Sequence, residues 1–186
     1  MLGIFKTPSY SGADSYKYVE NLIRQGRRIL IVSPYIDRYY ANFILSHSSG
    51  KSYHIISSSI EDGAKKLLTN GRFPTEFFAS TSLFFAADIM LLYLNLMQYF
   101  AYLTIVVAAM AALTFHSLTR RRGNINLKLP NEFVHAKIYI SENQAINGSA
   151  NLTYKGMHKN IEHVELTDDS NEIQRLEKQF WKLWNR

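Results

Sequence analysis

Two segments of the chain place apolar side chains at the spacing of an amphipathic helix. One covers residues 14–25, where Asp14 or Ser15 stands at the start and Gly26 follows the end. The other follows Asp169 or Ser170 near the end of the chain. The two apolar stripes consist of Tyr16, Val19, Leu22 and Ile23, and of Ile173, Leu176, Phe180, Leu183 and Trp184. We predict that both helices pack on a core through these faces.

Short apolar runs elsewhere predict strands. The runs at 29–32 and 53–57 are continuous, which is typical of strands covered on both faces of a sheet. Further strands are predicted at 125–129, 133–140 and 164–166, and a short helix at 62–68. This alternation of strands and helices predicts an α/β fold, with a mixed sheet flanked by helices.

Residues 77–118 form a long apolar stretch with a single formally charged residue, Asp88. The stretch is about twice the ~20 residues that one membrane crossing needs. It is flanked by basic residues, which the positive-inside rule places in the cytoplasm. These are Lys65, Lys66 and Arg72 before it and Arg120, Arg121 and Arg122 after it. We therefore predict a two-helix transmembrane hairpin over 76–118.

Two crossings are favoured over one because the residues on either side of the hairpin are predicted to form one domain. This discontinuous domain covers 1–75 and 119–186 and would lie on the cytoplasmic side of the membrane. The alternative is a helical hairpin that a partner or a second copy buries. Asp88 supports that alternative, since a carboxylate near the middle of a bilayer is costly.

The chain has 186 residues, which is enough for one modest domain with an insertion. Its formal net charge of +6 fits an anionic partner such as nucleic acid or acidic lipid, although basic flanks of a membrane segment would give the same excess. The absence of Cys excludes disulfides and Cys-based metal sites. The amino terminus lacks the features of a signal peptide, so we expect no secretion.

The candidate chemistry lies in the predicted strand 133–140 and the residues after it. His135 and Lys137 are two positions apart, so on an extended chain they project from the same face. An imidazole beside a fixed positive charge suits attack on a phosphodiester. The run Gly148-Ser149-Ala-Asn151 adds hydroxyl, amide and backbone donors for phosphoryl oxygens.

These residues resemble the HKD motif of the phospholipase D superfamily, which reads H-x-K-x4-D followed by G-S-x-N. Glu142 stands where the family usually has Asp, and the spacer to Gly148 is one residue shorter than the commonest form. The resemblance extends to Asn160-Ile-Glu162, which corresponds to a downstream N-x-E. It also includes the strand around 29–36. It implies a phospholipase D-like fold and a phosphodiesterase.

By this resemblance the catalytic residues are His135, Lys137, Ser149, Asn151 and Glu162, with Glu142 as a structural partner. One histidine attacks phosphorus to form a phosphohistidine, and a second protonates the leaving oxygen. Because the chain holds one H-x-K, the resemblance implies a homodimer that pairs two His135 residues at a two-fold axis. Lys137 and Asn151 would bind phosphoryl oxygens and Glu162 would orient His135. No metal or cofactor is implied.

The substrate stays open between two classes. Many small single-motif members of the superfamily cut nucleic acids, and the basic charge agrees with an endonuclease. A phospholipase D-type lipid hydrolase is the alternative, because the predicted anchor would hold the site beside lipid headgroups. A third hypothesis is a catalytically weak scaffold that binds an anionic partner, suggested by Glu142 and the short spacer. The sequence shows neither an obvious base-stacking platform nor a dedicated lipid pocket.

Overall fold

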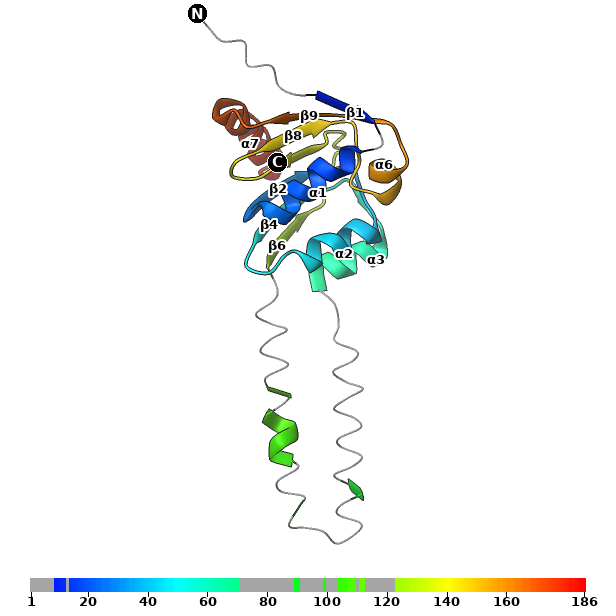
Figure 1. Cartoon of the computed structure of the whole chain (residues 1–186), viewed down its shortest axis with the longest axis vertical. Coiled ribbons are helices and arrows are strands. Elements are labelled where there is room, and N and C mark those ends of the chain that lie inside the picture. Colours follow the sequence, from blue (N-terminus) through cyan, green and yellow to red (C-terminus); the bar gives the residue numbers. More distant parts are fainter. Residues whose placement is uncertain are drawn as a thin grey trace, which may run out of the picture. The chain divides into compact units, whose positions relative to one another are not determined.

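A computed structural model describes residues 9–12, 14–70, 89–90, 99, 104–109, 111–112 and 123–186. The chain divides into two compact units. The first comprises Met1–Gly71 with Gly123–Arg186, and the second is Arg72–Arg122. The first unit carries the sheet and every predicted site residue (Figure 1).

The membrane prediction needs correction. Most of residues 76–118, where the hairpin is predicted, lie outside the described residues. Within the part of the chain that the structure describes, none of the helices combines the length and the apolar character that a membrane crossing requires. The prediction of a two-crossing membrane protein with a cytoplasmic catalytic domain is therefore wrong.

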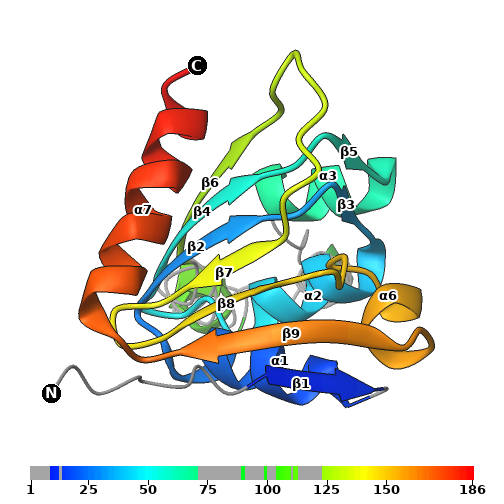
Figure 2. The same cartoon turned by 90° about the horizontal axis from the view of Figure 1, so that it is seen from above.

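A seven-stranded mixed sheet forms the centre of the first unit, in the order β1-β9-β8-β7-β2-β4-β6. Strands β2, β4 and β6 run parallel, whereas β7, β8, β9 and β1 continue the sheet antiparallel (Figure 2). The strands are β1 (Ser9–Gly12), β2 (Arg28–Val32), β4 (Ser52–Ile56), β6 (Asn124–Lys128), β7 (Ile138–Ile140), β8 (Ala145–Gly148) and β9 (Glu162–Thr167). Two short parallel strands, β3 (Tyr35–Ile36) and β5 (Ser59–Ile60), form a separate pair.

Helices cover both faces of this sheet, as the continuous apolar strands predict. One face packs against α1 (Ser15–Gln25), α2 (Arg38–Ser46), α3 (Asp62–Asn70) and α6 (Tyr154–His158). The other packs against α7 (Ser170–Trp184) through Ile173, Leu176 and Phe180 (Figure 2). Successive residues of β2 point to opposite faces, so Ile29 and Ile31 join the first core and Leu30 and Val32 the second. The predicted mixed α/β architecture is confirmed.

Local capping explains where several helices begin and end. Asp169 accepts a hydrogen bond from the backbone N–H of Asn171 at 2.8 Å and caps α7. Helix α1 follows Asp14, whose side chain pairs with Lys17 at 2.9 Å instead of capping the helix. The helix ends at Gly26, whose N–H donates to the carbonyl of Leu22. Both termini therefore lie within one residue of the predicted positions.

The strand predicted at 133–140 is shorter than expected and covers only Ile138–Ile140. The neighbouring strand explains this difference, because Ile138 pairs with Val32, the last residue of β2. Beyond Val32 the chain continues through Ser33 and Pro34, and proline has no N–H to donate to a ladder. His135 and Lys137 therefore lie just before β7 and outside its pairing with β2, although the Lys137 carbonyl still accepts from the N–H of Gly148 at 3.2 Å.

Candidate active site

The ends of four neighbouring strands, β2, β7, β8 and β9, lie side by side at one end of the sheet. The register pairs Val32 with Ile138, Ile138 with Asn147, and Gly148 with Val164. The carboxyl ends of β2 and β8 therefore lie beside the amino ends of β7 and β9. The segments after or before these ends carry His135, Lys137, Ser149, Asn151 and Glu162. Ligand sites in open α/β sheets occur at the carboxyl ends of the parallel strands, which is where this end lies.

Lys137 folds back onto His135. Its Nζ donates to the backbone carbonyl of His135 at 2.7 Å and lies 3.3 Å from Nδ1 and 3.5 Å from Nε2 of the ring. The His135 residue is exposed, whereas Lys137 is only 6% exposed. An anion that approached the imidazole would therefore meet the ammonium at the same time.

Burial lowers the pKa of Lys137 below its usual value, and the nearby Glu162 carboxylate opposes this shift by its charge. Among the described residues, no carboxylate forms an ion pair with Lys137 at close range. A buried ammonium without a close counterion favours binding of an anion, because the anion supplies the missing partner charge.

Ser149 and Glu162 form a hydrogen-bonded pair beside the lysine. The Ser149 hydroxyl donates to Glu162 Oε2, and the Asn160 carboxamide donates to Glu162 Oε1 at 3.0 Å. Ser149 Oγ also accepts from the backbone N–H of His163 at 3.0 Å. Among the hydrogen bonds of the described residues none joins Glu162 to the His135 ring. The structure thus places Glu162 against Ser149 and Asn160.

Gly148 is required by a close backbone approach between β8 and β9. A Cβ on this residue would lie 2.3 Å from the carbonyl oxygen of His163, which no side chain tolerates. The Ser149 N–H donates to that same carbonyl at 2.9 Å. The glycine therefore lets β8 and β9 approach closely at the point where Ser149 leaves the sheet.

The side-chain oxygen of Asn151 has no hydrogen-bond partner among the described residues. The residue is half-buried, and this oxygen, Oδ1, is enclosed. Leaving a buried polar atom unpaired costs about 1–3 kcal/mol. Such a cost is tolerated at positions that serve a ligand rather than the fold.

The loop that carries Ser149 and Asn151 is held by hydrogen bonds from three residues. The sequence alone did not single these residues out. Ser33 Oγ accepts from the N–H of Leu152 at 2.9 Å, and the Tyr139 hydroxyl donates to the carbonyl of Ala150 at 2.7 Å. Asp37 caps α2 through the N–H of Tyr40 and also accepts from the N–H of Tyr154. Burial raises the pKa of Tyr139 well above its usual value, so this hydroxyl stays a donor.

Glu142 does not belong to the group around His135. It follows β7, whereas His135 precedes it, so the two residues lie at opposite ends of that strand. Its carboxylate accepts from the backbone N–H of Arg27 at 2.9 Å and of Arg28 at 3.3 Å. Glu142 thereby fixes the start of β2.

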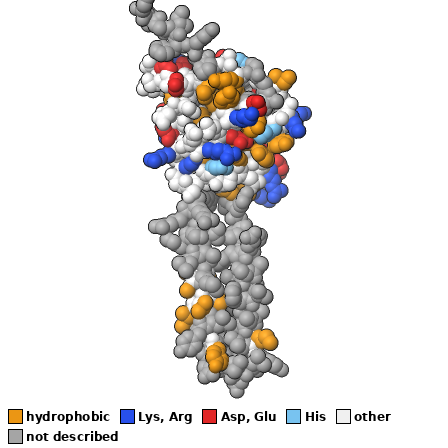
Figure 3. Space-filling model, viewed as in Figure 1, with side chains coloured by type: hydrophobic (Ala, Val, Ile, Leu, Met, Phe, Trp, Pro, Cys, Tyr) orange, Lys and Arg blue, Asp and Glu red, His pale blue; other side chains and the backbone are white. Residues whose placement is uncertain are grey.

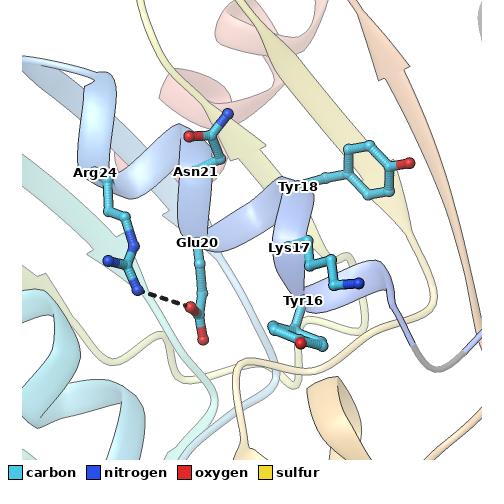
Figure 4. Close-up of a pocket in the computed structure, with 6 residues that line it drawn as sticks. All are labelled: Tyr16, Lys17, Tyr18, Glu20, Asn21 and Arg24. Carbon is cyan, nitrogen blue, oxygen red and sulfur yellow. Dashed lines mark hydrogen bonds and ion pairs between the residues drawn. The ribbon is translucent and has the colours of Figure 1, made fainter.

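A hollow of about 400 Å³ lies on α1, away from the residues described above (Figure 4). It is lined by Tyr16, Lys17, Tyr18, Glu20, Asn21 and Arg24. Its carboxylate, Glu20, is already paired, with Arg24 at 3.2 Å and with the hydroxyl of Tyr40 at 3.2 Å. None of the predicted site residues lines this hollow. In the described part of the chain, no group of three or more His, Cys, Asp or Glu could hold a metal ion.

Comparisons with known proteins agree with this geometry. A family model described as "Cardiolipin synthase, PLD-like domain" matches residues 18–184. The chain belongs to this family. It is thus a phospholipase D-like, phosphodiesterase-type domain.

Solved structures with a similar fold include NucT from Helicobacter pylori, at 15% identity and a TM-score of 0.58, which covers 97% of this chain and 96% of that one. Nuc from Salmonella typhimurium, described as a phospholipase D family member, has 12% identity and a TM-score of 0.57, covering 97% and 95%. Polyphosphate kinase from Porphyromonas gingivalis has 14% identity and a TM-score of 0.52, but only 26% of that chain is covered. No curated protein matches the chain significantly. At these identities the structures are alike in fold alone.

Proposed function

We propose that the protein is a metal-independent phosphodiesterase that cuts nucleic acid through a phosphohistidine at His135, in an active site shared by two copies of the chain. The observation that carries the proposal is the ammonium of Lys137, nearly buried and 3.3 Å from the imidazole of His135. This arrangement presents a nucleophile and a positive charge to the same anion.

The reaction has two steps. First, a ring nitrogen of His135 attacks phosphorus, an N–P bond forms and the bond to the leaving oxygen breaks. His135 of the partner subunit protonates that oxygen. The partner ring, now neutral, then takes a proton from water, and the resulting hydroxide attacks phosphorus and breaks the N–P bond. The products are an alcohol and a phosphomonoester, and both histidines return to their starting states.

The other residues bind and position the phosphoryl group. Lys137 supplies the positive charge to nonbridging oxygens, and the Asn151 amide adds a neutral donor. Ser149 supports the pocket through its hydrogen bond to Glu162. We infer that Glu162 turns toward the ring of His135 once substrate orders the site, because catalytic hydrogen bonds tighten in such complexes.

Nucleic acid is favoured as substrate by the net charge of +6 and by the resemblance to small single-motif members that cut nucleic acids. On the face of the first unit drawn in Figure 3, basic, acidic and histidine side chains are interspersed. Glu142 lies away from His135, so its replacement of the usual Asp does not alter the groups proposed to react.

One assay tests the substrate class. The purified full chain is incubated in EDTA with single-stranded DNA, RNA, double-stranded DNA and vesicles of anionic phospholipid. We expect cleavage of nucleic acid and no release of headgroup. Hydrolysis of the phospholipid alone would establish the lipid hydrolase instead. Binding of the nucleic acids without cleavage would establish the anion-binding scaffold.

A second assay tests the nucleophile. The His135→Asn variant should lose at least about 1,000-fold in kcat, since residues that act as a catalytic unit cost this much when one is removed. The wild-type protein, quenched at alkaline pH during turnover, should carry a labelled phosphoryl group that His135→Asn lacks. Full activity of His135→Asn would disprove the assignment.

A further inference from the structure

A pocket of about 580 Å³ opens beside His135. It lies between the segment that follows β6 and the end of α7. Its lining includes Lys128, Glu132, Phe133, His135, Leu183 and Arg186. Because His135 lines the pocket, a molecule bound there would lie directly next to the phosphorus that His135 attacks. The volume falls within the range of about 300–1,000 Å³ that small-ligand sites occupy.

Two exposed aromatic rings lie next to one another beginning at His135, so that the three rings form a row. The Phe133 ring lies 6.2 Å from the His135 ring, and the Tyr35 ring lies 5.9 Å from Phe133, measured between centroids. Phe133 is 58% exposed and Tyr35 is 46% exposed. A fold gains little by leaving two large rings in water, whereas bases of single-stranded nucleic acid stack on such rings.

The charges at the pocket favour a nucleotide over an acyl chain. Lys128 is half-buried in the lining, where its Nζ donates to the carbonyl of Trp184. Arg186 is exposed, and its Nη1 lies 4.0 Å from Glu132. A lipid tail would remove water from these cations and offer them no negative charge in return. A nucleotide places its base on apolar walls and its phosphates beside the cations.

We propose that this pocket binds the nucleobase adjacent to the scissile phosphodiester of a single-stranded nucleic acid, with the base stacked on Phe133. The inference rests on the proposed function, since the base is defined by the bond that His135 attacks. A base paired inside a duplex is not free to enter the pocket, so the site selects single strands.

The test uses single-stranded DNA oligonucleotides in which methylphosphonate linkages leave one cleavable phosphodiester. Three versions carry both flanking bases, no base on the 5′ side, or no base on the 3′ side. The wild-type full chain should cleave one of the two abasic versions with a kcat/KM about tenfold below that of the complete oligonucleotide, which matches the loss of one stacked base. In Phe133→Ala this difference should disappear, and in Phe133→Trp it should persist.

Tyr10→Ala is the matched control, because Tyr10 is also an exposed aromatic but lies on β1, at the opposite sheet edge from β6. It should behave like the wild type.

Equal cleavage of all three oligonucleotides by the wild type would overturn the pocket and leave the proposed function intact. If the wild type cleaves none, the proposed function fails. In that case fluorescence anisotropy tests the pocket through binding alone. Phe133→Ala should bind the complete oligonucleotide about tenfold more weakly than the wild type does, and its affinity for the abasic oligonucleotide that lacks the stacked base should not change. Hydrolysis of phospholipid alone overturns both.

Discussion

Lys137 is nearly buried, and the contacts of its ammonium go to the carbonyl and ring of His135. Burial therefore lowers its pKa, although Glu162 limits the shift. A lysine in this position loses its charge at a lower pH than an exposed lysine does. Together with the unpaired side-chain oxygen of Asn151, this lysine marks a region where polar groups lack partners within the fold and are suited to bind a ligand.

This environment predicts an alkaline limit to activity. As pH rises through the lowered pKa of Lys137, the ammonium deprotonates and kcat/KM should fall, at a pH below the value of 10.5 for an ordinary lysine. This fall is separate from the one that follows when the histidine that acts as acid loses its proton. Arginine stays charged to beyond about pH 12, so Lys137→Arg should lose the limb that belongs to Lys137 and keep the other. Its kcat/KM at neutral pH should drop about tenfold or more, because the guanidinium does not reproduce the geometry of the amine. The measurement is a pH profile of kcat/KM for both proteins.

Lys155→Arg is the matched control, since Lys155 is an exposed lysine on α6. Its profile should overlay that of the wild type. If the limb assigned to Lys137 stays in place in Lys137→Arg, another group causes it.

At the scale of secondary-structure elements, Glu142 connects β7 to β2. Burial alone would raise the pKa of this carboxyl, but its hydrogen bonds with backbone N–H groups, including those of Arg27 and Arg28, outweigh that effect and lower it. The ionised carboxylate thus stabilises the start of β2 in the folded state. This contribution is complete above the unfolded pKa of about 4.5 and is lost as pH falls through the lowered folded value.

Glu142→Gln should therefore reduce the free energy of unfolding by about 1 kcal/mol at pH 7, as the loss of a capping carboxylate does. The difference from the wild type should shrink below pH 4.5, the usual pKa of a glutamate. The kcat/KM of the folded protein should not change, because Glu142 lies at the far end of β7. Urea unfolding at several pH values measures the first effect. Glu132→Gln, which removes an exposed carboxylate with a 4.0 Å ion pair, should leave the free energy of unfolding unchanged.

The local pattern predicted most helices and strands correctly, because periodicity depends on residues that are close in sequence. It overestimated β7, since strand pairing ends where β2 ends at Val32. It also missed the helices α2 and α6 and the strands β1, β3, β5 and β8. Strand β1 pairs with β9 from the far end of the chain. Asp37 and Tyr154, whose contact positions the Asn151 loop, are 117 residues apart. Such long-range contacts leave no periodic signal in the sequence.

The candidate site was predictable to a similar extent. The spacing of His135 and Lys137 predicted that they share a face, and the motif located the loop with Ser149 and Asn151. The position of Phe133 near the site could also have been predicted. It lies two residues before His135, so on an extended chain both side chains project from the same side. Tyr35 joins this ring only through the fold, from the strand pair β3–β5.

At the scale of the whole molecule, the first unit presents one H-x-K at one end of the sheet, which is half of the proposed catalytic machinery. A second histidine with the same environment does not occur among the described residues. His158 packs between tyrosines and lies 3.5 Å from Glu20, and His54 packs against Trp181 and Trp184. Under the proposed mechanism, we therefore expect another copy of the chain to supply the acid that protonates the leaving oxygen.

This requirement predicts the behaviour of a mixed dimer. Wild-type and His135→Asn chains are given different affinity tags, co-expressed, and purified in sequence so that only dimers with one chain of each kind remain. In a shared site such a dimer keeps the nucleophile or the acid but never both, so kcat should fall at least about 100-fold, the typical contribution of a general acid. A dimer of two wild-type chains with the same two tags provides the reference rate. If each chain held a complete site, the mixed dimer would instead retain about half of that rate, because one of its two sites would be intact.

Recovery of monomers only would equally remove the shared site, since no two-fold axis would then bring the two His135 residues together.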